Sequence, residues 1–282
     1  MELFHFTIKN VNLFLRQYLI GVTSGSSTMI NCYTTGSVTG EYKVGGLVGK
    51  NRYSLQHCYS TCSISGEDSV GGLVGENNSE LTYCHSTGSV SGTSWFAGGL
   101  VGYSDGGTTN YCYSTGSVSG TKYVGGLIGF KDSHLQYCYS TGNIRGGSNV
   151  GGLIGHNNHN TLRDCYSTGS VSGNSYVGGL AGSSYSDIED SYTVGNVLGT
   201  GNNVGGLVGE NKSKLTYCYS TGSVSGNSYV GGLVGTHDYN DVKYCYSSGS
   251  VSGTGDNVGG LVGKNGHTVA EILLGYGYLR NK

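Results

Sequence analysis

The stretch that decides the fold is VGGLVGENKSKLTYCYSTGSVSG at residues 204–226, because close copies of it follow one another along the chain. The leucine of the Gly-Gly-Leu triplet marks each copy, and successive marks lie 26 to 28 residues apart. A nearly constant period of this length indicates a solenoid, in which each repeat forms one coil and packs on the next. A diverged further copy is expected around Leu19. The marking residues are Leu47, Leu73, Leu100, Leu127, Leu153, Leu180, Leu207, Leu233 and Leu261.

The composition decides which kind of solenoid forms. The chain has 282 residues, of which 54 are Gly and none is Pro. The repeated segments are rich in Val, Tyr, Thr and Ser, and so much Gly disfavours helices. A propeller blade needs about 40 residues, and collagen needs a glycine at every third position. We therefore predict an all-β fold, a right-handed parallel β-helix (β-solenoid) of about ten coils of roughly 27 residues, with rungs about 4.8 Å apart.

Three segments are expected along the chain. Residues 1–18, in which Phe4, Phe6 and Ile8 alternate, suit an N-terminal cap or edge strand. Residues 19–265 hold the repeats, and residues 266–282 form a C-terminal cap or tail, for which a short helix is one option. Because an open solenoid leaves strand edges unpaired, the apolar ends equally suit head-to-tail self-association into a filament.

Four rows of apolar side chains are predicted to fill the interior, beginning at Met29, Val38, Val44 and Leu47, and Leu55 is the second member of the first of these. In a strand, Leu55 and Cys58 would point to opposite faces, so both can point inward only if the chain bends between them. We favour that arrangement, with the following tyrosines and threonines outside; the reverse arrangement places the tyrosines in the core. The Gly-Gly pairs indicate a thin coil whose opposing walls touch over glycine.

Eight of the nine cysteines share one repeat position, where Ser191 stands in the remaining copy. Free cysteine packs as a small apolar side chain, which favours a row of reduced thiols. Disulfides between neighbouring coils are the alternative, since stacked Cα atoms lie within bridging range. No Cys-x-x-Cys pattern occurs, so we expect no metal and no cofactor. The row comprises Cys32, Cys58, Cys84, Cys112, Cys138, Cys165, Cys218 and Cys245, while Cys62 lies outside it.

Tyrosine and threonine recur at two positions of the repeat and form the candidate surface ladder. Tyrosine offers amphipathic contact area at low entropic cost, which suits adhesion to a glycan or a protein. A regular hydroxyl array also suits ice binding, and like-on-like stacking alone would stabilise the sheet. The candidate residues are Tyr59, Thr61, Tyr113, Thr115, Tyr139, Thr141, Tyr166, Thr168, Tyr219 and Thr221.

Several functional classes are disfavoured. A formal net charge of −2 provides no basic stripe for nucleic acid. No apolar run reaches the roughly 18 residues of a transmembrane helix. Neither His-Glu-x-x-His nor Gly-x-Ser-x-Gly occurs, so no enzyme activity is expected; a carbohydrate-active β-helix enzyme is the distant alternative. The polar segment 156–160 is interpreted as a solvated loop, and one-residue changes in period are assigned to loops such as 105–108.

The Gly-Gly-Leu-Val-Gly core followed by Cys-Tyr-Ser-Thr-Gly-Ser-Val-Ser-Gly resembles the GLUG motif of bacterial surface proteins, including immunoglobulin A peptidases and haemagglutinin-like adhesins. The resemblance covers about residues 19–265 and carries no catalytic residues. It implies a cell-surface or extracellular structural protein, an adhesive stalk or self-assembling fibre, with a host protein or glycan as partner. Residues 1–20 hold Glu2, Lys9 and Arg16 and so lack the uninterrupted apolar core of a signal peptide.

Overall fold

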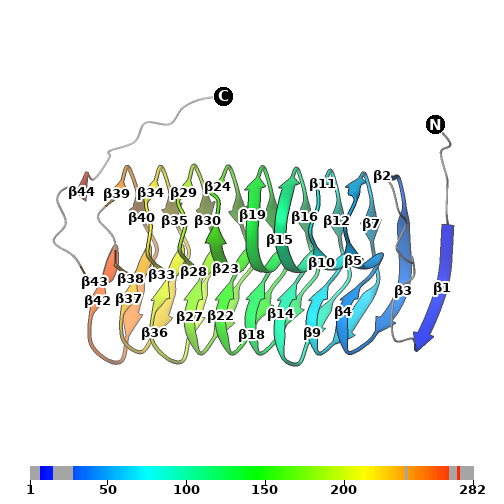
Figure 1. The fold of residues 1–282 in the computed structure, drawn as a ribbon. Helices are drawn as coiled ribbons and strands as arrows, with labels where there is room; N and C mark the ends of the chain where they lie inside the picture. Colours follow the sequence, from blue (N-terminus) through cyan, green and yellow to red (C-terminus); the bar gives the residue numbers. More distant parts are fainter. Residues whose placement is uncertain (1–6, 15–27, 239–240, 267–271, 274–282) are drawn as a thin grey trace.

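The computed structural model describes residues 7–14, 28–238, 241–266 and 272–273, and the regular elements in these ranges are all β-strands. The strands pair in parallel in three sheets that run along a rod (Figure 1). The prediction of a parallel β-solenoid with one coil per repeat is therefore confirmed. The diverged copy expected around Leu19 lies outside the described residues.

Sheet C contains the Val-Gly segment of each copy, and its nine strands mark nine coils. Each strand pairs in register with its equivalent in the next copy, as Val70 does with Ala97. Its strands are β4 (Tyr42–Gly45), β9 (Asp68–Gly71), β14 (Trp95–Gly98), β18 (Lys122–Gly125), β22 (Ser148–Gly151), β27 (Ser175–Gly178), β32 (Val204–Gly205), β37 (Val230–Gly231) and β42 (Val258–Gly259).

Sheet B follows the Gly-Gly-Leu bend, and in most coils it contains two short strands. Leu55 pairs with Leu81, and Leu81 with Thr109, so one apolar row runs along the sheet. Its strands are β2 (Thr28–Ile30), β5 (Val48–Asn51), β6 (Ser54–Gln56), β10 (Val74–Asn77), β11 (Leu81–Thr82), β15 (Val101–Asn110), β19 (Ile128–Gln136), β23 (Ile154–His159), β24 (Leu162–Arg163), β28 (Ala181–Ser184), β29 (Ile188–Glu189), β33 (Val208–Asn211), β34 (Leu215–Thr216), β38 (Val234–His237), β39 (Val242–Lys243), β43 (Val262–Asn265) and β44 (Ile272–Leu273).

Sheet A holds the Tyr-Ser and Val-Ser-Gly segments and ends each coil. Tyr59 pairs with His85, and Ile64 with Val90. Its strands are β1 (Thr7–Phe14), β3 (Tyr33–Thr39), β7 (Tyr59–Ser60), β8 (Ser63–Gly66), β12 (His85–Ser86), β13 (Val90–Gly92), β16 (Tyr113–Ser114), β17 (Val118–Ser119), β20 (Tyr139–Ser140), β21 (Ile144–Arg145), β25 (Tyr166–Ser167), β26 (Val171–Gly173), β30 (Tyr192–Thr193), β31 (Val197–Gly199), β35 (Tyr219–Ser220), β36 (Val224–Gly226), β40 (Tyr246–Ser247) and β41 (Val251–Gly253).

Each coil bends at two residues that adopt the left-handed backbone conformation. One precedes the cysteine, as His57 does with a φ of 53°, and the other precedes the Val-Gly-Gly segment, as Ser69 does with a φ of 55°. The bend at His57 turns the chain between Leu55 and Cys58, and both side chains are fully buried. The expectation that leucine and cysteine both point inward is therefore confirmed, and the arrangement with tyrosines in the core is wrong.

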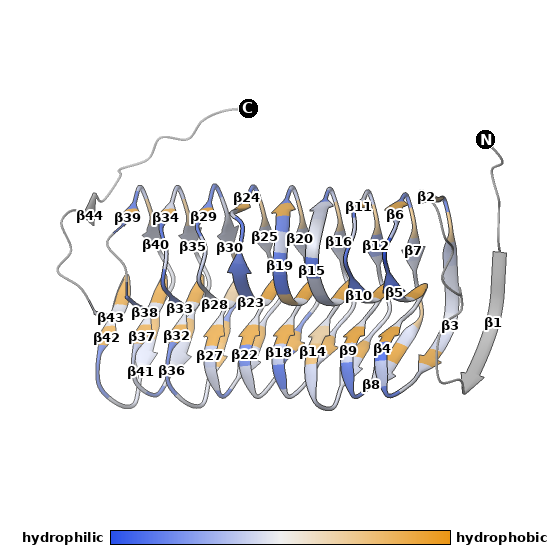
Figure 2. Cartoon of the chain, in the orientation of Figure 1, coloured by the Kyte–Doolittle hydropathy of each residue, from blue (hydrophilic) through white to orange (hydrophobic). Residues whose placement is uncertain are grey.

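The interior is divided into two apolar cores. The larger contains the Gly-Gly-Leu leucines, the residues that follow them, the Leu55 row and the cysteine row. The smaller contains the rows of Val70 and Val90 together with Cys62. Hydrophobic residues accordingly recur at the same level in successive coils (Figure 2).

Glycine brings the two walls together between these cores. A β-carbon on Gly126 would lie 2.9 Å from the Cβ of Ser140 on the opposite wall, and it would overlap the carbonyl oxygen of Gly152 in the next coil. The same close approach recurs at the equivalent glycines Gly46, Gly72, Gly99, Gly152, Gly206 and Gly232. The predicted contact of opposing walls over glycine is confirmed.

Two expectations about irregular segments need correction. Residues 105–108 are part of β15 and form a β-bulge against β19, because Gly106 and Gly107 take φ values of 84° and 72° that absorb the extra residue within the strand. Near the C-terminus, the described pair Ile272–Leu273 is strand β44 paired with β39, where a short helix was one option. At the other end, β1 pairs in parallel with β3, as an edge strand would.

Among the residues that the structure describes, none belong to a helix with the length and apolar character needed to span a membrane.

Candidate functional site: the aromatic surfaces and the internal polar rows

The tyrosine column is the set of side chains that directly follow the cysteine position, and it forms an unbroken stack along sheet A. Neighbouring ring centroids are 4.7 to 5.1 Å apart, and neighbouring ring planes differ by at most 6°. The parallel register of sheet A produces this stack, because it places equivalent Cβ atoms one rung apart. Its members are Tyr33, Tyr59, His85, Tyr113, Tyr139, Tyr166, Tyr192, Tyr219 and Tyr246.

Stacking determines what the tyrosine column can present to a partner. Each inner ring has a neighbouring ring over both faces, and its side chain is half-buried, so ring edges and hydroxyl groups face outward. Burial raises the pKa of Tyr139, Tyr166 and Tyr219, with a smaller contribution from neighbouring tyrosines. These phenols therefore remain protonated at neutral pH and can both donate and accept hydrogen bonds.

The threonine row lies beside the tyrosine column, two residues further along each copy. Thr61, Thr115, Thr141, Thr168 and Thr221 are all exposed. Their tyrosine partners in the candidate ladder, Tyr59, Tyr113, Tyr139, Tyr166 and Tyr219, are half-buried. The structure thus places the predicted ladder residues together on one outer face.

A second aromatic stack, which we call the corner column, was missed by the sequence analysis. It consists of the residues before the cysteine, where the chain bends, and its tyrosines are 44% to 56% exposed. Neighbouring rings stack with centroids 4.8 to 5.0 Å apart. The recurring Tyr-Cys-Tyr triplet was the available signal, since a buried central residue leaves both neighbours outside. The column contains His57, Tyr83, Tyr111, Tyr137, Tyr217 and Tyr244, and Asp164 and Asp190 interrupt it.

All nine cysteines are buried free thiols. The Sγ of Cys112 accepts a hydrogen bond from the Cys84 amide at 3.3 Å, and the Oγ of Ser191 accepts one from the Cys165 amide at 3.1 Å. Serine therefore performs the same structural role as cysteine in this row. Burial raises the pKa of Cys138, and the thiol is not a nucleophile at neutral pH.

A row of polar residues also lies inside the solenoid. In most coils its member stands at or near the end of the first sheet B strand, as Asn51 does in β5 and Asn77 in β10. Asn51 donates to Asn77 at 2.7 Å, and Asn157 donates to Ser184 at 2.8 Å. Such buried polar side chains are stable only when they are hydrogen-bonded. The row comprises Asn51, Asn77, Ser104, Lys131, Asn157, Ser184, Asn211 and His237.

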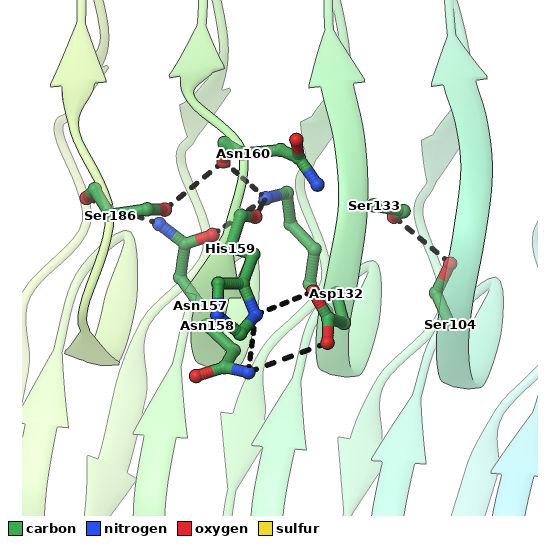
Figure 3. A network of polar contacts seen from close by, with 9 residues as sticks. Ser104, Asp132, Ser133, Asn157, Asn158, His159, Asn160 and Ser186 are labelled. Carbon is green, nitrogen blue, oxygen red and sulfur yellow. Dashed lines mark hydrogen bonds and ion pairs between the residues drawn. The ribbon is translucent and has the colours of Figure 1, made fainter.

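Lys131 is the exceptional member of this internal row, because its side chain is fully buried. Its ammonium donates to the Asn157 side chain at 2.8 Å and to the carbonyl oxygens of His159 and Asn160, both at 2.7 Å (Figure 3). Burial lowers the pKa of Lys131 to about 7, since desolvation disfavours the charged form. The burial of Lys131 could not be predicted from the sequence, because a lone lysine in a polar segment normally faces solvent.

The polar segment 156–160 is therefore not the solvated loop that was expected. His156 and Asn157 are buried on strand β23, and only His159, which ends the strand, and the following Asn160 are exposed. His156 Nδ1 and Ser183 Oγ are 2.6 Å apart, and burial lowers the pKa of His156 to about 4. The imidazole of His156 is consequently neutral at physiological pH.

The acidic residues near β29 are engaged in contacts between coils. Asp187 accepts hydrogen bonds from the Ser213 hydroxyl and the Lys214 amide, and Glu189 pairs with Arg163. Within the described ranges, no group of three or more His, Cys, Asp or Glu residues is arranged to hold a metal ion. The geometry of these residues supports the stacking of coils.

Taken together, the fold and its rows define a β-solenoid repeat protein with stacked aromatic surfaces. Four segments match the family model of the GLUG motif, at residues 66–91, 146–172, 200–225 and 226–252. The chain is therefore a GLUG-motif repeat protein. No match was found among curated proteins or among solved structures.

Proposed function

We propose that this protein is a non-enzymatic structural element of the cell surface or extracellular space, acting as an adhesive stalk or a self-assembling fibre. The observation that carries the proposal is the unbroken tyrosine column beside the exposed threonine row. A rigid rod that presents the same hydroxyl-bearing groups on every rung can make many weak contacts along one partner, and these contacts add through multivalency. The partner would be a host protein or glycan.

The proposed absence of catalysis rests on how the polar groups are used. Asp187, Glu189 and His156 each have a partner in a neighbouring coil. Catalytic residues need access to a substrate, whereas His156 and its partner Ser183 are both buried. We therefore infer that these three polar side chains connect neighbouring coils.

Fibre formation is supported by the two ends of sheet C. In the described part of the chain, this sheet begins at β4 and ends at β42. Val258 of β42 is 44% exposed, although the interior members of its row, such as Val230, are fully buried. Strand edges of this kind can pair with another chain, so β42 of one copy can add to β4 of the next.

Adhesion is tested by placing charge on the threonine row. The variant T115E/T141E/T168E should abolish binding to immobilised host proteins or neutral glycans, because carboxylates block close approach to the tyrosine column. The control T200E/T254E introduces carboxylates at exposed threonines outside the row and should keep binding. Equal binding by both variants would contradict an adhesive role for this face.

Ice binding is the second candidate, favoured by the regular rung spacing of the exposed threonines. Thermal hysteresis in dilute solution tests it directly. Hysteresis that disappears in T115E/T141E/T168E would favour ice over an adhesive partner, and its absence in the unmodified protein would remove this candidate.

A further inference from the structure

Two rows beside the bend between sheets C and B differ from copy to copy, in contrast to the nearly constant leucine, valine and tyrosine rows. The stacking of like side chains accounts for the rows whose residue type is nearly constant. A position whose residue type changes in every coil is not fixed by stacking and can determine which ligand a solenoid surface binds. The first row precedes each Val-Gly segment and contains Lys43, Ser69, Phe96, Tyr123, Asn149, Tyr176, Asn203, Tyr229 and Asn257. The second lies seven residues further on and contains Lys50, Glu76, Tyr103, Phe130, His156, Ser183, Glu210, Thr236 and Lys264.

The two variable rows face each other across the bend between sheets C and B. At the N-terminal end, Lys43 pairs with Glu76 at 2.6 Å. Further along, Asn149 donates to Ser183 at 2.8 Å, and Asn203 accepts from Thr236 at 2.9 Å. The contacts thus change along the rod from ionic to uncharged, and each segment has its own chemistry.

The middle segment is aromatic, and we call it the aromatic cluster: Trp95, Phe96, Tyr103, Tyr123, Phe130, His156 and Tyr185. Trp95 and Tyr185 are 44% and 43% exposed, whereas His156 is nearly buried and supports the ring of Phe130 at 4.9 Å. The rings of Trp95 and Tyr123 are tilted by 46°, and those of Tyr123 and Phe130 by 88°.

This tilt distinguishes the aromatic cluster from the tyrosine column. In the column, parallel rings cover one another's faces, so a ligand meets edges and hydroxyl groups. In the cluster, Phe96 stacks on Tyr123, but the Trp95 ring is tilted by 62° and 46° against these two neighbours. Trp95 therefore stays 44% exposed, with the Lys122 ammonium over its ring. A ring face carries partial negative charge and attracts the C–H groups on the apolar side of a sugar ring.

Two ammonium groups border the aromatic cluster. Lys122 Nζ lies 4.2 Å from the Trp95 ring centroid, and no ion pair between Lys122 and a carboxylate is present within the described ranges. Lys212 Nζ lies 4.6 Å from the Tyr185 ring centroid and 3.6 Å from a Glu210 carboxylate oxygen. Lys122 therefore supplies a positive charge beside an exposed ring, which complements a carboxylate carried by a ligand.

We propose that the aromatic cluster binds an acidic carbohydrate chain, with sugar rings packing on Trp95 and a sugar carboxylate pairing with Lys122. The inference rests on the adhesive role proposed above but places carbohydrate recognition on a different face of the rod. It also assigns recognition to a few coils in the middle of the chain, since only there do the two rows hold aromatic residues in consecutive coils. Elsewhere Tyr176 and Tyr229 alternate with asparagines.

Trp95 provides a direct probe, because it is the only tryptophan in the chain. Titration of the full chain with oligogalacturonate should change Trp95 fluorescence in a saturable manner, and a neutral malto-oligosaccharide of equal length should not. K122Q should weaken the apparent affinity about tenfold or more, as expected for loss of a charged hydrogen bond. K243Q removes one positive charge outside the cluster and should leave the affinity unchanged.

A second variant keeps the test independent of fluorescence. Binding to immobilised polygalacturonate should be lost in W95A and retained in Y42A, because Tyr42 is an exposed aromatic residue at the equivalent register position in the first coil of sheet C. An unchanged Trp95 signal, an equal response to the neutral chain, or equal loss in K122Q and K243Q would overturn the proposal. Glycan binding that survives W95A but is lost in T115E/T141E/T168E would overturn it while supporting the proposed adhesive face.

Discussion

Ser86 lies directly opposite Gly72, so close that a β-carbon on Gly72 would be 2.9 Å from the Cβ of Ser86 and nearer still to its hydroxyl oxygen. Gly72 is in the bend between sheets C and B, and Ser86 is in β12 of sheet A. The contact separates the larger apolar core from the smaller one. Repetition of this pair in successive coils makes the solenoid thin and explains the constant second glycine of the Gly-Gly-Leu triplet.

Substitution of Gly126 by alanine should strongly destabilise the protein. The new methyl group would overlap the Gly152 carbonyl and the Ser140 side chain, and backbone cannot yield as a flexible side chain does. We expect a loss of about 3 kcal/mol or more in the free energy of unfolding, measured by urea denaturation. Gly260 has the same repeat position but nothing within 4 Å of its added β-carbon, so G260A is the matched control and should change stability little. Equal effects would contradict the wall contact.

Replacement of Lys131 by asparagine should stabilise the protein at neutral pH, because asparagine occupies the same internal row at Asn77 and Asn157. The folded-state pKa of Lys131 is lowered to about 7 from its ordinary value of 10.5. Between these values the unfolded state binds more protons, so the unmodified protein gains stability as pH rises from 7 to 10.5. The advantage of K131N should therefore be largest at pH 7 and below and should shrink towards pH 10.5. A difference in unfolding free energy that does not vary with pH would refute the buried ammonium.

Tyr139 tests how much the tyrosine column stabilises the sheet. Removal of its ring in Y139A breaks the stack with Tyr113 and Tyr166, and we expect a loss of about 1 to 2 kcal/mol. Y139H should recover part of that loss, because His85 already stacks between Tyr59 and Tyr113. Thermal denaturation of the unmodified protein, Y139A and Y139H measures these differences in stability. If Y139H were as unstable as Y139A, ring stacking would contribute little.

The thiols of the cysteine row should not react with thiol reagents in the folded protein. Since all nine thiols are buried, Ellman's reagent should label few of them before unfolding and all nine in guanidinium without reductant. Fewer than nine after unfolding would demonstrate disulfides between coils. C165S should cost less than about 1.5 kcal/mol, because Ser191 already fills this position in the next coil.

Most of the architecture could be predicted from the periodicity of the sequence alone. The constant spacing of the leucines predicted one coil per copy, and the glycine pairs predicted that opposing walls touch over glycine. The serine partner of each glycine, such as Ser140 for Gly126, was not predicted. The tyrosines and threonines of the ladder emerged on the predicted face, because a single bend before each cysteine fixes which residues point out. Thr109 shows that an apolar row tolerates one polar residue, since its neighbours Leu81 and Leu135 are buried.

Contacts between rows could not be predicted in the same way. Tyr123 and Phe130 belong to different rows and meet edge to face, yet neither row has a constant residue type that a repeat pattern would highlight. The burial of Lys131 likewise depends on how segment 156–160 folds over it. Sequence periodicity identifies which residues share a row, whereas the packing of one row against another requires the course of the backbone at each bend.

The central claim is that equivalent residues of consecutive copies lie one rung apart along a single axis. Distances between spin labels test it most directly, with ketone-bearing amino acids at exposed threonine positions so that the native cysteines are left intact. Labels at Thr61 and Thr168, four rungs apart, should be separated by about 19 Å, and labels at Thr61 and Thr221, six rungs apart, by about 29 Å. Such an increase of about 4.8 Å per copy would support the solenoid, whereas distances that do not grow with the number of intervening copies would contradict it.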